Sequence, residues 1–137
     1  MKPKIGISEK NLKHVCEMLS RILSDESLLY MKTRKFHWNV SGESFMELHK
    51  LFQSHYQQLE ESIDEVAERI NKLGCPTIGT MKEFLAHTNI KESPGKYPSS
   101  KHMIVELLSD HETVIVELRK DVIACSENYK DLGTLKN

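Results

Sequence analysis

Apolar side chains recur at helical spacing along most of the chain. In residues 11–39 they follow one another at steps of three, four and seven. In residues 45–73 steps of three and four continue for about eight turns, which is the strongest helical pattern in the sequence. Residues 101–130 carry a similar one-sided pattern. The chain is therefore predicted to form three long amphipathic helices, and no segment alternates as a strand would.

The polar residues at the ends of the first two segments predict where these helices begin and end. Ser8 or Asn11 is expected to cap the first helix. Ser44 and Glu47 have the spacing of a capping box, so the second helix should begin directly after Ser44. Gly74 directly follows the second segment and is a typical helix stop.

Residues 74–100 separate the second and third long helices and are rich in helix-breaking residues. They hold three of the four prolines and three of the six glycines. Thr80 is predicted to cap a short helix over residues 81–87 within this crossover, and Ser99 or Ser100 to cap the third long helix.

Two antiparallel helices, a long crossover and another helix have the connectivity of a ferritin-like four-helix bundle. We therefore predict one all-α domain over residues 1–137. The third helix should end by Gly133, so the fourth helix is largely missing before the chain stops at Asn137. Three helices leave an apolar seam open, which either a neighbouring chain covers or a longer native chain fills.

Composition narrows the classes of protein that fit. The net charge of −1 excludes a strongly polycationic nucleic-acid binder. No apolar run approaches the roughly 18–20 residues of a membrane span, and residues 1–13 lack the apolar core of a secretory signal. Cys16, Cys75 and Cys125 are odd in number and widely spaced, which favours reduced thiols and a cytoplasmic location.

Four residues of metal-ligand type gather around the second helix: His37, His49, Asp64 and Glu68. Asp64 and Glu68 are one turn apart and share a face. His49 lies fifteen residues before Asp64, or roughly 22 Å along the axis at 1.5 Å per residue. The histidines and the acids therefore cannot bind one metal ion within a single straight chain.

Two-fold symmetry removes this difficulty. If two copies pack their second helices antiparallel, His37 and His49 of one chain approach Asp64 and Glu68 of the other, and two equivalent sites result. Two imidazoles and two carboxylates with open positions suit ferrous iron and its oxidation. They also suit zinc or manganese, and the ligand types alone do not decide between these ions.

The segment His37-Trp38-Asn39-Val40-Ser41-Gly42, with the spacing to Phe45, His49 and Asp64-Glu65-Val66-Ala67-Glu68-Arg69, resembles the Dps family, the DNA-protecting mini-ferritins of bacteria. The similarity covers about residues 11–134. It implies a ferroxidase that binds Fe²⁺ between subunits, oxidises it, preferably with hydrogen peroxide, and stores Fe³⁺ in a hollow dodecamer. It also implies that His37, His49, Asp64 and Glu68 are the catalytic metal ligands and that Trp38 lies beside them.

Gln53 departs from the family pattern, in which an aspartate or glutamate commonly follows the second histidine by four residues. Gln53 is a weaker iron ligand than a carboxylate, so a second iron position is doubtful. The alternative function is therefore a DNA-compacting shell with a vestigial iron site, and a plain helical interaction module is a third. Trp38 either packs or absorbs a stray oxidising equivalent.

The remaining polar residues have less specific interpretations. The other histidines are expected to be structural or solvated: His14, His55, His87, His102 and His111. Acidic residues such as Glu61 and Glu65 either face solvent or nucleate ferric mineral, and Glu127 and Asp131 are candidates for a pore. The basic N-terminal arm, with Lys2, Lys4, Lys10 and Lys13, offers at most non-specific contact with DNA and the nucleoid.

Overall fold

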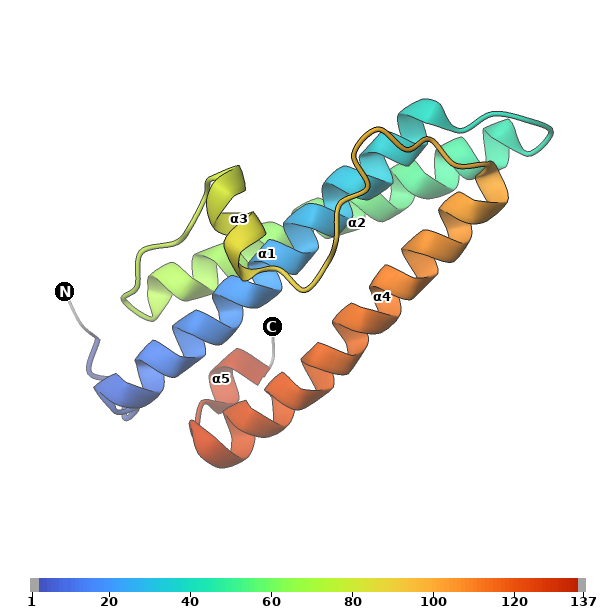
Figure 1. Ribbon diagram of the computed structural model, residues 1–137. Helices are drawn as coiled ribbons and strands as arrows, with labels where there is room; N and C mark the ends of the chain where they lie inside the picture. Colours follow the sequence, from blue (N-terminus) through green and yellow to red (C-terminus); the bar gives the residue numbers. More distant parts are fainter. Residues whose placement is uncertain (1–2, 136–137) are drawn as a thin grey trace.

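A computed structural model describes residues 3–135, and within this range all regular structure is helical. The elements are α1 (Glu9–Asn39), α2 (Phe45–Lys72), α3 (Met81–His87), α4 (Ser100–Ile123), a π-helical turn η1 (Ala124–Asn128) and α5 (Leu132–Leu135). Figure 1 shows α1, α2 and α4 as three long, roughly aligned rods. The predicted all-α fold class, with a short helix in the crossover, is confirmed.

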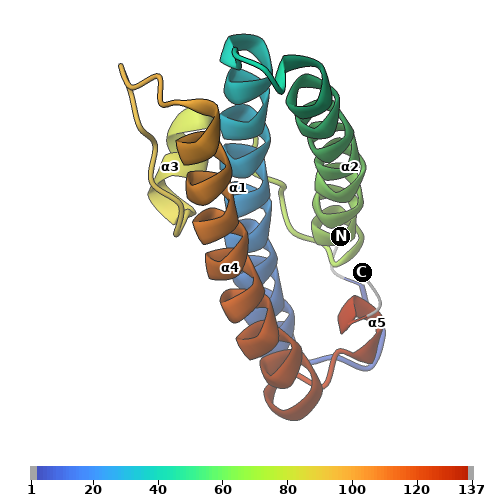
Figure 2. The ribbon, with the colours of Figure 1, turned by 90° about the vertical axis from the view of Figure 1, so that its right-hand side faces the viewer.

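Helices α1 and α2 form an antiparallel hairpin, and α4 runs alongside α1 in the direction of α2 (Figure 2). Two apolar clusters hold the three helices together. The larger cluster includes Val15, Leu19 and Leu23 of α1 against Val66 and Ile70 of α2. At the other end of the bundle a second cluster brings α4 into the core through Met103 and Leu107. Burial of one face of each helix is what the spacing of apolar positions requires.

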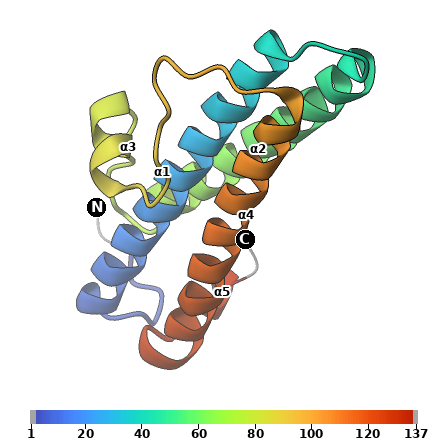
Figure 3. The same cartoon turned by 45° about the vertical axis from the view of Figure 1, so that its right-hand side comes forward.

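The connection from α3 to α4 runs back along α1 before α4 begins (Figure 3). Polar side chains of α1 fasten it at successive levels. Asp25 Oδ1 accepts hydrogen bonds from the Thr88 hydroxyl and the backbone N–H of Asn89. Farther along α1, Lys35 Nζ donates to the carbonyls of Ser93 and Lys96. The crossover therefore has a fixed path although it carries little regular structure.

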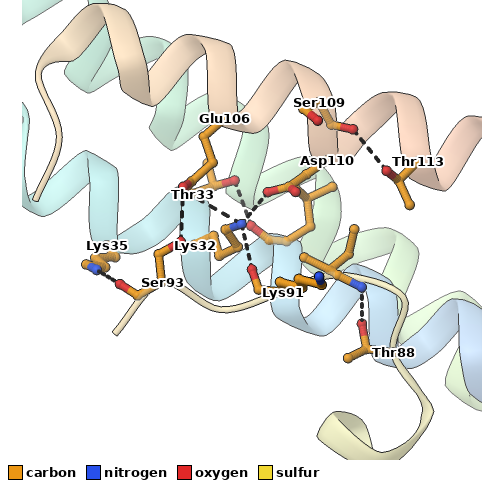
Figure 4. A network of polar contacts seen from close by, with 12 residues as sticks. Lys32, Thr33, Lys35, Thr88, Lys91, Ser93, Glu106, Ser109, Asp110 and Thr113 are labelled. Atoms are coloured by element: carbon orange, nitrogen blue, oxygen red, sulfur yellow. Dashed lines mark hydrogen bonds and ion pairs between the residues drawn. The ribbon is translucent and has the colours of Figure 1, made fainter. Parts of the chain in front are cut away.

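Lys32 is a buried cation among these contacts between α1 and the crossover, and Figure 4 shows its partners. Its ammonium donates to the Lys91 carbonyl at 2.9 Å and pairs with Asp110 at 2.5 Å and Glu106 at 3.6 Å. Ser93 adds a hydrogen bond to Glu106. A buried charge is tolerated when it is both paired and hydrogen-bonded, as here. The network ties α1, the crossover and α4 together.

The helix starts agree with the sequence at three of four positions. The side chains of Ser8 and Ser99 each accept a hydrogen bond from the third backbone N–H that follows, and Thr80 forms a complete capping box with Glu83. The predicted capping box at Ser44 is wrong, because Ser44 is the N-cap residue of α2 but makes no side-chain cap bond. Its φ of −94° and ψ of 25° are not the extended conformation that directs a capping side chain at the helix.

The C-terminal part differs from the expected single helix over residues 101–130. The α-helical part ends at Ile123, one π-helical turn follows, and Gly133 lies inside α5 rather than ending a long helix. Asp131, a candidate pore residue, is buried and bonded to Arg69 and Thr134. Asp131 therefore does not line a pore, because its buried carboxylate binds Arg69 of α2 and Thr134 of α5.

The expectation of reduced thiols is also wrong for two of the three cysteines. Cys16 of α1 and Cys75, just after α2, form a disulfide with a Cα–Cα distance of 6.5 Å. Both residues lie in or against the larger apolar cluster, so the fold itself brings them together. Cys125 is a free, buried thiol. The spacing along the chain could not reveal this pair, because 59 residues and a helical hairpin separate the two cysteines.

A row of large apolar side chains on α4 remains uncovered. Each of the following is 44–58% exposed: Ile104, Val105, Leu108, Ile115, Val116, Val122 and Ile123. This row is the open seam expected from three helices. In residues 3–135 we find no helix with the length and apolar character that crossing a bilayer demands. Lys2 of the basic arm lies outside the described residues.

Candidate metal centre

His37 and His49 lie side by side where α1 and α2 meet at the hairpin. His37 is in the last turn of α1 and buried, and His49 is in the second turn of α2 and half-buried. Their rings stack with centroids 3.8 Å apart and planes 20° apart. The sequence predicted that both histidines lie near the same helix start, and the hairpin turn brings them into direct contact.

Each histidine is held by the backbone of the other. His37 Nδ1 lies 2.7 Å from the His49 carbonyl oxygen, and His49 Nδ1 lies 2.9 Å from the His37 carbonyl oxygen. A carbonyl only accepts hydrogen bonds, so each Nδ1 must carry the proton and donate it. In the neutral rings the lone pair is therefore on Nε2. This is the arrangement in which histidine binds a metal, with its second nitrogen bonded to a carbonyl.

Aromatic groups surround the histidine pair. Tyr56 meets the His37 ring edge-on at 5.3 Å, and Phe45 stacks on His49 at 5.0 Å. The Arg34 guanidinium lies over the rings of Tyr56 and Trp38, at 4.5 and 5.5 Å from their centroids. These contacts restrict the imidazoles further. Trp38 itself is 59% exposed, so it extends the site toward the surface.

Asp64 and Glu68 lie on α2, beyond its midpoint, and both are exposed. In the part of the chain described, no hydrogen bond or ion pair engages either carboxylate. Both oxygens of each group are available to a ligand. The surrounding segment is well fixed, since the Thr77 hydroxyl donates to the Ala67 carbonyl at 2.9 Å.

A single chain therefore presents two separate groups, the histidines and the acids. Among residues 3–135, no three side chains of His, Cys, Asp or Glu come close enough to hold a metal ion. Gln53, the doubtful fifth ligand, is one turn beyond His49 on α2 and partly exposed. Glu61 and Glu65 are exposed on the same helix.

One acidic residue escaped the sequence analysis. Glu26 of α1 is only 7% exposed, and it accepts a hydrogen bond from Ser62 at 3.0 Å. Burial raises the pKa of its carboxyl to about 7, the Ser62 bond opposes this shift, and Asp25 and Glu65 add repulsion. Glu26 lies on the buried face of α1. In the sequence, its burial is indicated by a charged residue at a position where helical spacing predicts an apolar one.

Comparisons with known proteins agree with this architecture. The family model for the ferritin-like domain matches residues 16–136. The chain is 40% identical over 130 residues to an uncharacterized low temperature-induced protein of Nostoc, covering 95% of this chain and 73% of the relative. It is 37% identical over 108 residues to DNA protection during starvation protein 2 of Bacillus anthracis, covering 79% and 73%.

Solved structures give the same result. The Dps protein of Vibrio cholerae, described as one of the ferritin-like diiron-carboxylate proteins, superposes with a TM-score of 0.91 at 27% identity, covering 98% of this chain and 84% of that one. DpsC of Streptomyces coelicolor gives 0.93 at 28% identity, covering 99% and 78%. Sequence motif, family model and superposition all lead to one conclusion: the chain belongs to the Dps family of ferritin-like proteins.

Proposed function

We propose that this protein is a ferroxidase whose metal sites form between two chains. His37 and His49 of one chain supply the nitrogen ligands, and Asp64 and Glu68 of its two-fold mate supply the carboxylates. The observation that carries this proposal is the reciprocal bonding of the two imidazoles, which leaves both Nε2 atoms for a metal. The free carboxylates of Asp64 and Glu68 support the second half.

Exposed apolar side chains near the histidines support a neighbouring chain at this face. Met31 and Trp38 of α1 and Met46 of α2 are 45%, 59% and 54% exposed. Met31 and Trp38 line one pocket together with Met81 and Leu85 of α3, which are 65% and 49% exposed. Large apolar groups gathered in this way are typical of protein interfaces. The two-fold packing would cover them while it completes the metal sites.

Iron enters this reaction as the substrate. Two Fe²⁺ ions each lose one electron, hydrogen peroxide gains both electrons, and with two protons it becomes two molecules of water. The carboxylates favour Fe³⁺ over Fe²⁺, because the higher charge gains more from each negative ligand. Paired removal of electrons avoids the hydroxyl radical that a single-electron reduction of peroxide releases. Oxidation at the site therefore detoxifies iron and peroxide together.

Storage and DNA protection complete the proposal. The oxidised iron would collect in a hollow dodecamer built from two-fold dimers, in the cytoplasm and near the nucleoid. The name of the Bacillus anthracis relative, DNA protection during starvation protein 2, supports a protective role. Removing Fe²⁺ and peroxide protects DNA from oxidative damage whether or not the shell touches DNA. Any direct contact would be non-specific and would weaken steeply with salt.

The test is anaerobic mixing of purified protein and Fe²⁺ with limiting hydrogen peroxide. We expect two Fe²⁺ oxidised per peroxide, without hydroxyl radical detected by a spin trap. Sedimentation or size-exclusion mass should show an assembly of twelve chains. A protein that retards DNA at low salt but oxidises iron no faster than buffer would instead be a DNA-compacting shell. A monomer without oxidation would be an interaction module.

A further inference from the structure

A disulfide fixes the connection that follows α2 to the first half of α1. It joins Cys16 of α1 to Cys75, which comes three residues after the end of α2. Figure 1 shows the end of α2 beside this part of α1. The two residues differ in access to solvent, because Cys16 is 6% exposed whereas Cys75 is only half-buried. A thiol in solution can therefore reach the disulfide through Cys75.

The third cysteine is unsuited to exchange with this pair. Cys125 is 0% exposed, and its thiol contacts the thioether of Met18 at 3.7 Å. Burial is the main cause that raises the pKa of the Cys125 thiol to about 11. A thiol that stays protonated is a poor nucleophile, since the thiolate is the reactive form. Thiol–disulfide chemistry in this chain is therefore confined to Cys16 and Cys75.

The connection that carries Cys75 also contacts the end of α2. The Cys75 backbone N–H donates to the Ile70 carbonyl at 3.3 Å, and the Thr77 hydroxyl donates to the Ala67 carbonyl at 2.9 Å. Thr77 and Glu68 line the same surface hollow. The connection therefore forms one side of the space around the Glu68 carboxylate, and the disulfide fixes that side to α1.

We propose that Cys16 and Cys75 are a reversible dithiol–disulfide couple that regulates iron binding between the subunits. In the disulfide form the surroundings of Glu68 are fixed, and a ligand held in place in advance binds a metal ion more tightly. In the dithiol form the connection after α2 is released from α1, so Glu68 loses this support. The proposal rests on the ferroxidase function proposed above, in which Glu68 is an iron ligand.

Hydrogen peroxide, the oxidant of the proposed iron reaction, also forms the disulfide. One thiolate attacks a peroxide oxygen, an S–O bond forms as the O–O bond breaks, and the departing hydroxide takes up a proton to become water. The second thiol then attacks the sulfenic sulfur, the S–S bond forms, and a second water leaves. Two thiols thus give two electrons to one peroxide.

A dithiol reductant reverses the reaction. Its thiolate attacks the Cys75 sulfur, Cys16 leaves and takes up a proton, and the second reductant thiol then releases Cys75 while the reductant becomes a disulfide. Disulfides that form in the cytoplasm, the location proposed for this protein, are usually transient and redox-sensing. Iron would therefore be bound tightly when peroxide is present to oxidise it.

Anaerobic calorimetry of the unaltered protein tests the proposal with Fe²⁺. A phosphine produces the dithiol form and is removed before the titration. We expect Fe²⁺ to bind the dithiol form at least tenfold more weakly, with unchanged helix content by circular dichroism and faster amide exchange chiefly in residues 74–79. Equal Fe²⁺ affinity of the two forms would overturn the proposal, and so would reduction that occurs only when the helices unfold. A disulfide form that binds no Fe²⁺ would refute the ferroxidase site itself, and this regulation with it.

Two variants sharpen the calorimetric test. Cys75→Ser, which forms no disulfide, should bind Fe²⁺ as weakly as the dithiol form whether or not phosphine was used. Cys125→Ala is the matched control and should keep the full difference between its two forms. A Cys75→Ser protein that folds and binds Fe²⁺ as tightly as the disulfide form would contradict the proposal. The measurement on the unaltered protein stands if a variant does not fold.

The midpoint potential of the couple provides an independent measurement. Coupling between two sites is reciprocal, so a tenfold preference of a metal ion for the disulfide form lowers this potential by about 30 mV. Saturating Mn²⁺, a dication that changes no oxidation state under anaerobic conditions, should produce this shift in glutathione buffers. The shift should be absent in His49→Ala, which lacks a proposed ligand. An unchanged potential in the unaltered protein, or an equal shift in His49→Ala, would overturn the proposal.

Discussion

The two halves of the candidate iron site contrast sharply within one chain. The histidine half is buried at the hairpin, stacked, and bonded through both Nδ1 atoms to backbone carbonyls. The acidic half, Asp64 and Glu68, is exposed, and within the described residues no hydrogen-bond donor or cation contacts its carboxylates. Contacts within one chain therefore fix the two imidazoles in position, whereas the two carboxylates remain accessible to a second chain. Substitutions in the two halves should therefore behave differently.

The largest effect on stability is expected from loss of the disulfide, which links α1 to the residue Cys75 that follows α2, the helix of Asp64 and Glu68. Cys75→Ser should lower the free energy of unfolding by about 4 kcal/mol, since the bond closes a loop across 59 residues of separation. Denaturant unfolding under oxidising conditions measures the loss. Reductant should lower the stability of the unaltered protein to that of the variant and leave the variant unchanged. Equal stability of both proteins without reductant would contradict this prediction.

Glu26 shows what burial does to an acid, in contrast to exposed Asp64 and Glu68. Its pKa is raised to about 7, so the folded state holds the proton more tightly than the unfolded state. Its stabilising contribution is complete below about pH 4.5 and is lost as the pH rises to about 7, a difference of about 3 kcal/mol. Glu26→Gln should remove this loss, so thermal unfolding at pH 8 should occur at higher temperature. A variant less stable than the unaltered protein at pH 8 would refute this account.

A substitution in the histidine half should change both the rate of iron oxidation and the free energy of unfolding. His49→Ala removes a ligand and should slow peroxide-dependent iron oxidation by at least about 100-fold, more than the loss of an outer-shell partner causes. It also leaves the His37 carbonyl without its donor, which should cost about 1 kcal/mol of stability. Stopped-flow absorbance and denaturant unfolding measure the two effects, and His87→Ala is the control. Unchanged oxidation kinetics would rule out His49 as a ligand.

The acidic half should affect chemistry alone. Asp64→Asn should slow oxidation by about 10–100-fold, while the free energy of unfolding changes by less than about 0.5 kcal/mol because the side chain is exposed. Glu60→Gln, an exposed acid of the same helix, is the matched control and should change neither quantity. If the control slows oxidation as much as Asp64→Asn does, general surface charge rather than ligation is responsible.

The smallest effect concerns Gln53, beside the histidine half. Gln53→Asp adds a carboxylate one turn from His49 and should tighten a second iron position by on the order of tenfold. Isothermal titration with Fe²⁺ under anaerobic conditions measures the number of ions per dimer. Gln53→Glu should give the same direction of change. No increase in bound iron with either acid would exclude position 53 from the site.

The sequence was sufficient for the features that depend on local pattern. Apolar spacing predicted the long helices, Ser8 and Ser99 cap two of them as expected, and Thr80 caps the short helix α3. The rise per residue of a helix is enough to show that His49 and Asp64 lie too far apart to share one ion within a chain. The nearness of His37 and His49 followed from the short turn between their helices.

Features that depend on tertiary packing were not accessible in this way. The disulfide and the buried cation Lys32 require contacts between residues 59 or more positions apart. Local spacing says nothing about such pairs. The Ser44 prediction failed for a related reason, since the turn before α2 sets backbone angles that a capping pattern cannot reveal.

Complementation between two inactive variants tests the central proposal most directly. A chain with His49→Ala keeps its acids, and a chain with Asp64→Asn keeps its histidines, so a mixed two-fold dimer would contain one intact site and one doubly altered site. Random co-assembly should restore peroxide-dependent oxidation to about one quarter of the unaltered rate per chain. If co-assembled chains stay as inactive as each variant alone, ligands from two chains do not share one iron, and the proposed site is wrong.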